Sequence, residues 1–478
     1  MRFTLDLKLV KKITTLAVPA VMAMLTQTAI NLLDTAMVGR LPGAVGINGV
    51  AAIGLSLPVF WALGGFLSAI AIGTQAITAR RVGEGELKLA GRVLTNALVV
   101  AVFSGLAVSL AGYFYIPQLF PLLNPNPEVA RLAGDYCRLR MLGIFSMVTT
   151  TAYKGFFDGI GKTYVHLVAS VVMNLTNAFL NAVLIFGLLG FPRLEVQGAA
   201  LASLISTFIG LGTMIAWSLF STIRKNFNIY SLRNLKGKIM REIVRLSLPS
   251  GLATVFVMSG FEFFFWVVAN LPSEPMFFAP LAFLPLLGSV IGVEELTQPD
   301  IASSASWVII SCLMLVFMTS IAMGTATATL VSQSLGARNP ELAERYGWES
   351  VKLGMYIMGA LGLVAIFTPH FLLGIFTDKE QVIVGAQPSM RLMGAVFSLM
   401  SAGLILVQAL FGAGATTFVM VAEMLMHGLC LVPLSYLLST VVGLGLVGAW
   451  VAAAIYVLLL SSIMAWKFYG GSWKKIHL

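Results

Sequence analysis

The distribution of apolar residues constrains the fold of this chain more than any other feature. Of its 478 residues, 58% are hydrophobic and only 10% are charged, a balance that soluble domains do not sustain. A helix needs about twenty predominantly apolar residues to cross a bilayer. The sequence therefore predicts an all-α integral membrane protein with twelve transmembrane helices. These spans are approximately 14–38, 47–72, 92–116, 130–153, 163–188, 196–221, 244–269, 302–328, 346–368, 384–409, 417–440 and 444–466.

Basic residues are distributed unevenly among the loops that join these runs. Lysine and arginine gather before the first run, in alternate loops after it, and at the C-terminal end. Because cytoplasmic loops carry an excess of positive charge, this pattern predicts that both termini are cytoplasmic. The net charge of +10 therefore does not indicate a nucleic-acid partner. The first run continues to Val38, too long for a cleaved signal peptide, and is interpreted as a retained helix of a multi-pass plasma (inner) membrane protein.

The chain repeats itself at offsets near 250 residues. Residues 73–83 realign with 326–336 at an offset of 253, and residues 159–163 realign with 412–416 at the same offset. Pro19 in the first run corresponds to Pro249 in the seventh. Each repeat holds six spans, and an even number gives both halves the same orientation, with a pseudo-twofold axis along the membrane normal. The predicted units are an N-lobe (1–222), a cytoplasmic linker (223–240), a C-lobe (241–466) and a cytoplasmic tail (467–478).

One segment, 271–301, has no counterpart in the first half. It is apolar in part, but Pro280, Pro285 and Gly288 interrupt it. A single additional crossing here would place the later basic loops outside the cell, against the positive-inside bias. We therefore expect an extracytoplasmic insert that does not span the membrane.

The first span carries a carboxylate, Asp34, within an apolar run. A charge at the bilayer centre costs roughly 2.5–3.5 kcal/mol on insertion scales, and such a residue is a functional-site hypothesis by default. Gln27 and Asn31 precede it at intervals of four and three, so one helix face carries all three side chains. We predict that Gln27 and Asn31 line a substrate cavity. The alternative is that Asp34 reaches the membrane interface and has no role in transport.

The fifth span carries a stripe of amides. Asn174, Asn177 and Asn181 are spaced by three and four residues, which places them on one side of a helix. Buried amides need hydrogen-bond partners, and Asp34 is the obvious candidate. Amides beside a carboxylate can hold a proton or a small hard cation. The alternative is that these asparagines only hydrogen-bond neighbouring helices together.

A second intramembrane acid, Glu262, lies in the seventh span. The repeat places it two residues from the equivalent of Asp34, so it is predicted to line the substrate cavity. The alternative places it at the outer interface.

Other motifs exclude several kinds of chemistry. The three cysteines and four histidines are scattered, which indicates neither disulfides nor a metal site. The sequence GIGKT at 159–163 ends like a phosphate-binding loop, but Phe156 stands where that motif requires glycine. Without an ATPase motif, transport would be driven by an ion gradient, with no cofactor. The loops hold no arrangement that indicates an enzyme.

These motifs together make the chain resemble the multidrug and toxic compound extrusion (MATE) transporters along almost its whole length, most of all their archaeal and DNA-damage-inducible branch. The resemblance implies two six-helix lobes that form a V around a central cavity. It also implies export of organic cations in exchange for protons or sodium ions. The matching stretches are Pro19, 34–40, 73–83, 159–163, 177–187, 198–202 and 335–337.

The resemblance also implies which residues couple transport to the ion. Asp34 matches the N-lobe acid of that branch, Asn177 its span-five asparagine and Ser203 its span-six hydroxyl. Asn181 departs from the pattern, because the branch has an aspartate there. Other branches use an acid in the seventh span where this chain has Val257, so coupling is expected in the N-lobe.

The expected function is therefore a secondary antiporter that exports cationic amphipathic molecules by alternating access, as a monomer in the lipid bilayer. The alternative within the same superfamily is a lipid-linked saccharide flippase, which usually has more spans and more charges in its cavity.

Overall fold

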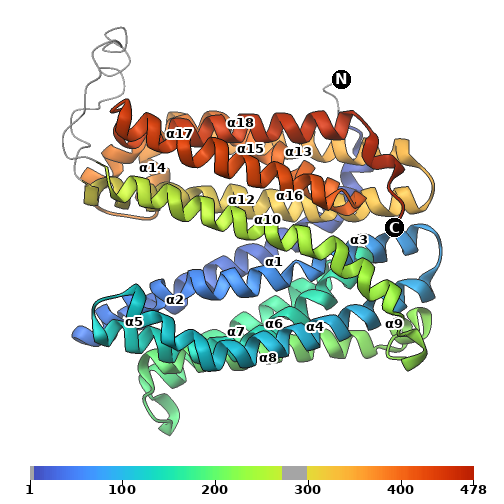
Figure 1. Ribbon diagram of the computed structural model, residues 1–478, viewed down its shortest axis with the longest axis horizontal. Coiled ribbons are helices and arrows are strands. Elements are labelled where there is room, and N and C mark those ends of the chain that lie inside the picture. Colours follow the sequence, from blue (N-terminus) through green and yellow to red (C-terminus); the bar gives the residue numbers. More distant parts are fainter. Residues whose placement is uncertain (1–4, 272–298) are drawn as a thin grey trace.

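The computed structural model describes residues 5–271 and 299–478, apart from the side chains of 28–33, 35, 44 and 299–301. The predicted insert 271–301 lies almost wholly outside these residues. Every regular element within the described ranges is helical. The helices run side by side in two groups, with both ends of the chain at the same end of the bundle (Figure 1). We call this the termini end.

The N-lobe contains the helices of the first six spans. Its long helices are α1 (Leu7–Gly39), α2 (Ala44–Ser68), α3 (Ile70–Gly83), α4 (Leu87–Tyr115), α6 (Pro127–Gly159), α7 (Tyr164–Phe186) and α8 (Glu195–Leu219). The helices α5 (Phe120–Leu123) and α9 (Ser221–Phe227) are short connections. The predicted linker 223–240 overlaps the end of α9 and the start of α10.

The C-lobe repeats this arrangement. Its helices are α10 (Gly237–Ala269), α12 (Pro299–Gly336), α13 (Pro340–Phe367), α14 (Pro369–Gly374), α15 (Glu380–Ala413), α16 (Thr416–Leu425), α17 (Val432–Tyr436) and α18 (Gly445–Tyr469). Within the described residues, eleven helical stretches are long and apolar enough to cross a membrane. The helix α6 has 33 residues but carries more charge, and it supplies the twelfth span. The predicted two-lobe, all-α membrane architecture is confirmed.

Two spans differ in detail from the prediction. The second span was expected to end at residue 72, but α2 and α3 form one helical stretch that continues to Gly83. Arg80 and Arg81 therefore lie on the last turn of a helix and not in a loop, because backbone hydrogen bonding continues where apolar composition stops. The eleventh span contains two π-helical turns, Met426–Leu431 and Leu437–Val441. Such turns are rare and occur mostly at functional sites.

The repeat is visible in reciprocal contacts between the lobes. A Cβ atom on Gly83 would lie 2.0 Å from the Gln333 carbonyl oxygen, and one on Gly336 would lie 2.1 Å from the Arg80 carbonyl oxygen. Gly83 and Gly336 are equivalent at the offset of 253, and so are Arg80 and Gln333. The contact is therefore self-complementary, as expected across a twofold axis. Only glycine lets α3 and α12 approach this closely.

Polar side chains lie at the same crossing. Gln75 of α3 donates to the Thr325 carbonyl and to Thr329 Oγ1 of α12, each at 2.8 Å, and Ser332 donates to the Ala76 carbonyl at 2.8 Å. The two lobes are thus joined by buried hydrogen bonds, which strengthens their contact near the termini end.

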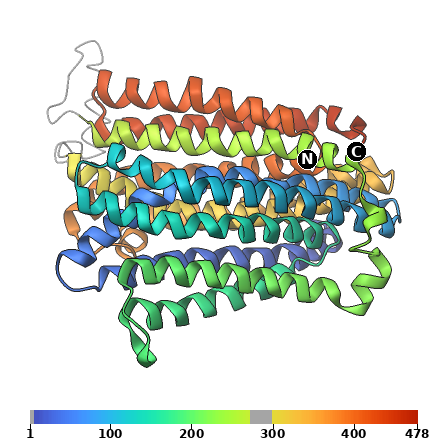
Figure 2. The ribbon, with the colours of Figure 1, turned by 60° about the horizontal axis from the view of Figure 1, so that its bottom comes forward.

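The first helix of each lobe packs partly on the other lobe. In α1, Leu9 and Ile13 belong to a core cluster made largely of C-lobe residues, whereas Val38 packs in an N-lobe cluster. In α10, Ile243 packs in the N-lobe and Phe264 in the C-lobe. Figure 2 shows that both helices run along the bundle among the others. Each of these two helices therefore connects the lobes mechanically.

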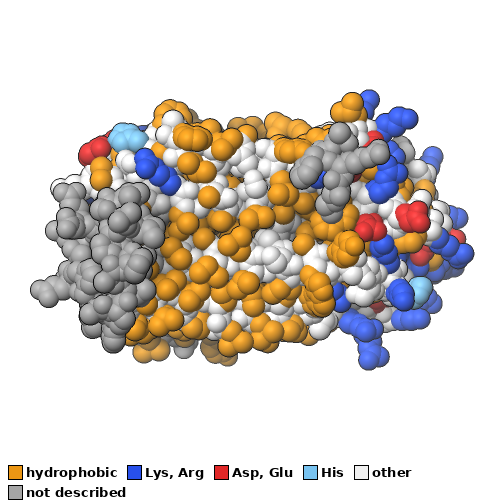
Figure 3. Space-filling model, turned by 90° about the horizontal axis from the view of Figure 1, so that it is seen from above, with side chains coloured by type: hydrophobic (Ala, Val, Ile, Leu, Met, Phe, Trp, Pro, Cys, Tyr) orange, Lys and Arg blue, Asp and Glu red, His pale blue; other side chains and the backbone are white. Residues whose placement is uncertain are grey.

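The molecular surface divides into an apolar belt and a charged end. Figure 3 shows hydrophobic side chains across the middle of one face, while lysine and arginine gather at the termini end. This distribution is that of a protein surrounded by lipid over its central part.

Candidate functional site

Asp34 lies in a polar cluster where three N-lobe helices meet. Asn181 Nδ2 of α7 donates to Asp34 Oδ1 at 2.5 Å, and Ser203 Oγ of α8 lies 3.4 Å from Asp34 Oδ2. The structure therefore brings together a carboxylate from α1, an amide from α7 and a hydroxyl from α8. Asn181 and Ser203 are buried, and Asp34 is half-buried.

Asn177 completes this cluster. Its amide satisfies both neighbours when the nitrogen donates to Asp34 Oδ1 at 2.7 Å and the oxygen accepts from Ser203 Oγ at 3.2 Å. The described hydrogen bonds to the carboxylate come from neutral side chains, and no described basic group lies within salt-bridge distance of it. An ionised carboxylate has acceptor sites beyond those used here. The site can thus accept a proton or a small cation.

For the other residues predicted on α1 and α7, the structure shows no hydrogen bond to the Asp34 cluster within the described side chains. Asn174 is buried on the same helix, and neither of its amide atoms has a hydrogen-bond partner among the side chains that the structure describes. Gln27 is half-buried on α1, and the side chain of Asn31 lies outside the described residues. Asn174 is therefore close in sequence to the cluster without a hydrogen bond to it.

Glu262 does not line a described cavity. Its side chain is exposed on α10, whereas Phe264, two residues further on, is buried and faces a pocket. Two residues turn a helix by about 200°, so these side chains point to nearly opposite sides. The prediction that Glu262 lines a substrate cavity therefore does not hold for the C-lobe pocket that the structure describes.

One N-lobe residue was missed by the sequence analysis. Arg140 lies within the charged helix α6, with its guanidinium 4.4 Å from the ring centre of Phe60. Its Nε is buried and has no hydrogen-bond partner in the part of the chain that the structure describes. Arg140 also lies close enough to Asp34 to interact electrostatically. A basic residue in the predicted span 130–153 should have been noticed by the rule that identified Asp34.

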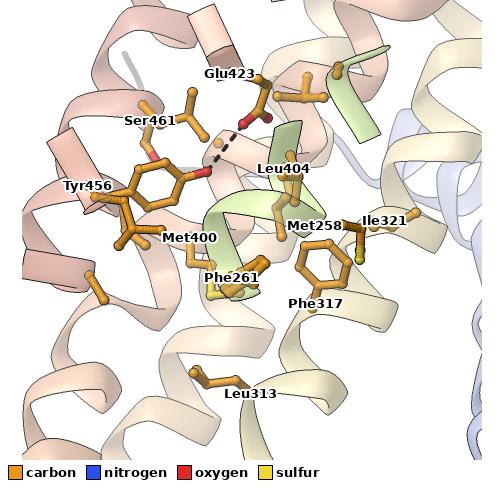
Figure 4. Close-up of a pocket in the computed structure, with 18 of the residues that line it drawn as sticks. Met258, Phe261, Leu313, Phe317, Ile321, Met400, Leu404, Glu423, Tyr456 and Ser461 are labelled. Atoms are coloured by element: carbon orange, nitrogen blue, oxygen red, sulfur yellow. Dashed lines mark hydrogen bonds between the residues drawn. The ribbon is translucent and has the colours of Figure 1, made fainter. Parts of the chain in front are cut away.

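A pocket of about 260 Å³ lies in the C-lobe. Its walls come from α10, α12, α15, α16 and α18, and most of the lining side chains are apolar or aromatic. Glu423 and Tyr456 point toward one another on one side of it (Figure 4). The Tyr456 hydroxyl donates to Glu423 Oε2 at 3.2 Å. Glu423 is 6% exposed.

The sequence contained a signal for this pocket. Glu423 is an acid within the apolar run 417–440, and His427 follows four residues later on the same helix face. The four histidines are dispersed relative to one another, so His427 is conspicuous only when its spacing from Glu423 is considered. Among the residues that the structure describes, no group of three or more histidine, cysteine and acidic side chains could hold a metal ion.

Two equivalent six-span lobes with polar clusters at membrane depth define a membrane transporter built from parallel repeats. The chain belongs to the MatE family, whose model matches residues 19–183 and 287–437. This confirms the resemblance to the MATE transporters as a family, and it makes the chain a transporter and not an enzyme.

Relatives of similar length carry the name probable multidrug resistance protein NorM. The protein from Thermotoga maritima is 25% identical over 471 residues, which cover 97% of this chain and 93% of that protein. The protein from Bradyrhizobium diazoefficiens is 26% identical over 462 residues, which cover 95% of this chain and 91% of that protein.

Solved structures share the fold. A transporter of the MOP superfamily from Pyrococcus furiosus, described as having a binding pocket of reverse polarity, has a TM-score of 0.83 and 24% identity, covering 98% of this chain and 97% of its own. An outward-facing MATE family transporter also has a TM-score of 0.83, with 23% identity and the same coverage.

Proposed function

We propose that this protein is a multidrug efflux antiporter that exports organic cations in exchange for protons or sodium ions by alternating access. The observation that carries the proposal is the Asp34 cluster on α1. A carboxylate at membrane depth there accepts hydrogen bonds from two amides of α7, and the Ser203 hydroxyl of α8 lies beside it. The names of the NorM relatives support multidrug substrates.

The position of α1 suggests how the ion would drive the exchange. Binding of a proton or a sodium ion at Asp34 changes the charge that Asn181 and Ser203 face, and therefore the contacts of α1 with α7 and α8. The first turns of α1 pack on the C-lobe, where Asp6 pairs with Arg345 at 2.8 Å. A shift of α1 at one end is thus transmitted to the contact between the lobes.

The orientation in the membrane follows from charge. The termini end carries the gathered lysine and arginine side chains (Figure 3), which supports a cytoplasmic location for that end in the plasma (inner) membrane. The contact between α3 and α12 closes the same end. The proposed outward-facing state would receive its coupling ion from outside.

Among the alternatives, a lipid-linked saccharide flippase is less well supported. Glu423 is the one charged residue among the described residues that line the C-lobe pocket. Such a pocket suits an apolar molecule with one positive charge better than a saccharide with many polar groups.

Transport in proteoliposomes tests the proposal. Purified protein is reconstituted with a fluorescent organic cation, and movement of the cation is followed under an imposed pH gradient or an imposed sodium gradient. We expect movement against the concentration of the cation with one of the two gradients and none without a gradient. Transport that requires neither gradient would contradict antiport.

A further inference from the structure

The C-lobe pocket has the composition of a site for an aromatic cation. Its lining includes the aromatic side chains Phe261, Phe264, Phe317, Trp450 and Tyr456. Aromatic faces attract cations, most strongly where water is excluded. Its volume of about 260 Å³ is just below the range of about 300–1,000 Å³ that is typical of small-molecule pockets. The pocket therefore suits an occupant with a single ring.

Glu423 places one carboxylate in this apolar pocket, and few of the described groups around it balance its negative charge. Within the described part of the chain, Tyr456 supplies the only hydrogen bond to the carboxylate, at 3.2 Å. No lysine or arginine is among the described lining residues. Because a buried charge is costly unless it is paired, the carboxylate needs a cation or a proton.

His427 does not meet this need. Its Nδ1 lies 2.9 Å from the Glu423 backbone carbonyl, an oxygen that only accepts, so the proton on Nδ1 is directed there. The same Nδ1 lies 3.4 Å from Glu423 Oε2, and Nε2 is buried and has no hydrogen-bond partner among the described residues. The imidazole thus donates its Nδ1 proton to the backbone carbonyl of Glu423, and it lies beside the carboxylate without neutralising it.

The local backbone holds these groups together. His427 lies in the π-helical turn Met426–Leu431, and its ring centre is 4.7 Å from that of Tyr456 and 6.1 Å from that of Phe261. A Cβ atom on Gly260 would lie 2.4 Å from His427 Cδ2. Glycine at this position therefore lets α10 press against the imidazole, which fixes the wall behind the carboxylate.

We propose that Glu423, backed by Tyr456 and His427, is the anionic contact of a C-lobe binding site for small aromatic organic cations with one positive charge. The cationic group of the ligand lies near the carboxylate, and its ring lies among Phe261, Phe317 and Met400 (Figure 4). That this ligand is also a transported cation rests on the proposed function. The inference places this contact in the other lobe from Asp34.

The test uses benzyltrimethylammonium, which combines one ring with a permanent positive charge. Its binding to the purified full-length protein in lipid nanodiscs is measured by calorimetry, together with neopentylbenzene, its neutral analogue of the same shape. We expect the cation to bind and the neutral analogue to bind at least about tenfold more weakly, because a single charge pair is worth more than one decade of affinity at moderate dielectric constant. Equal binding of the two probes would overturn the proposal.

Three variants locate the contact. Glu423→Gln should weaken cation binding by about tenfold or more, whereas Glu423→Asp, which keeps the charge, should stay within about threefold. The matched control Glu262→Gln removes an exposed acid and should bind as the unmodified protein does. All variants are first shown to be monodisperse and to unfold at similar temperatures. Unchanged binding by a folded Glu423→Gln protein would overturn the proposal and leave Glu423 as a protonated structural acid.

Asp34→Asn separates this inference from the proposed antiport. If the inference is correct, Asp34→Asn still binds benzyltrimethylammonium, and adding Glu423→Gln to it weakens that binding about tenfold further, even where neither protein transports. Should Asp34→Asn abolish cation binding while Glu423→Gln retains it, the binding site lies in the N-lobe and the C-lobe proposal fails alone. If Glu423→Gln weakens cation binding but no ion gradient drives transport, the antiport proposal is wrong and the proposed C-lobe binding site is supported.

Discussion

The two lobes place their polar groups on equivalent helices but at different depths. At the offset of 253, Asn174 of α7 corresponds to His427, and Glu423 corresponds to Ser170. Asn181, which contacts Asp34, corresponds to Leu434, eleven residues beyond Glu423 or about 16 Å along a helix axis. The N-lobe acid comes from the first span of its lobe, whereas the C-lobe acid comes from the fifth. The shared scaffold therefore carries two chemically different sites.

This difference suggests a division of labour. The N-lobe carboxylate is surrounded by amide and hydroxyl donors, an arrangement that suits a proton or a small hard cation. The C-lobe carboxylate stands in an aromatic pocket, which suits an organic cation. The helix α7 is regular, whereas the eleventh span contains two π-turns, and such turns are frequently found at functional sites.

The largest expected effect is that of Asp34→Asn. The amide is nearly the same size but cannot carry a negative charge, so it cannot exchange a proton or a sodium ion. We expect gradient-driven efflux to be abolished while expression and folding remain normal, as measured in proteoliposomes and by gel filtration. If Asp34→Asn transports at the rate of the unmodified protein, ion coupling lies outside the N-lobe. The proposed separation of ion coupling in the N-lobe from cation binding in the C-lobe would then be wrong.

A large effect is also expected where the lobes touch. In Gly83→Val, the new side chain would overlap the Gln333 carbonyl, since a Cβ alone would lie 2.0 Å from it. Overpacking of this kind costs about 1–3 kcal/mol. We expect a lower unfolding temperature and loss of transport. The matched control is Gly212→Ala in α8, where a Cβ meets nothing within 4 Å. Equal behaviour of the two variants would show that the α3–α12 contact contributes nothing to transport.

The sequence predicted the architecture well because its evidence is redundant. Apolar length, loop charge and the repeat at Gly83 and Gly336 all lead to the same two-lobe bundle. The N-lobe cluster followed from one acid and a regular amide stripe, because helical periodicity brings such residues to one side. The direction of Glu262 could not be obtained in this way, since an error of two positions in the repeat alignment reverses a helix face.

The C-lobe site is a different case. Glu423 and His427 were visible as an acid and an imidazole four residues apart in an apolar run. Their partner Tyr456, however, lies on another helix, and the π-turns change the register of side chains beyond His427. No single-sequence pattern predicts those turns, so the pocket emerges only when five helices are placed together.

The amide stripe of α7 allows a matched comparison of intermediate effect. Asn181→Ala removes a donor from Asp34, and hydrogen bonds to charged groups are worth about 1.5–3 kcal/mol. We expect the transport rate or the ion affinity to fall about tenfold or more. Asn174→Ala removes an amide that makes no hydrogen bond to any described group, and it should change stability and transport less than Asn181→Ala does. A larger loss in Asn174→Ala than in Asn181→Ala would move the ion site along α7, toward the depth of His427.

The smallest expected effect is that of Glu262→Gln. The side chain is exposed and is not among the described residues that line the C-lobe pocket. Substitutions at exposed positions usually change stability by less than about 0.5 kcal/mol, which corresponds to about a twofold change in an equilibrium constant. We therefore expect transport rates and cation affinity within about twofold of the unmodified protein. A loss comparable to that of Asp34→Asn would mean that α10 rotates during transport and brings Glu262 toward the substrate. The C-lobe would then couple to the ion through the seventh span. The difference between the lobes would reflect the conformation of the protein and not a difference in the groups that bind ions.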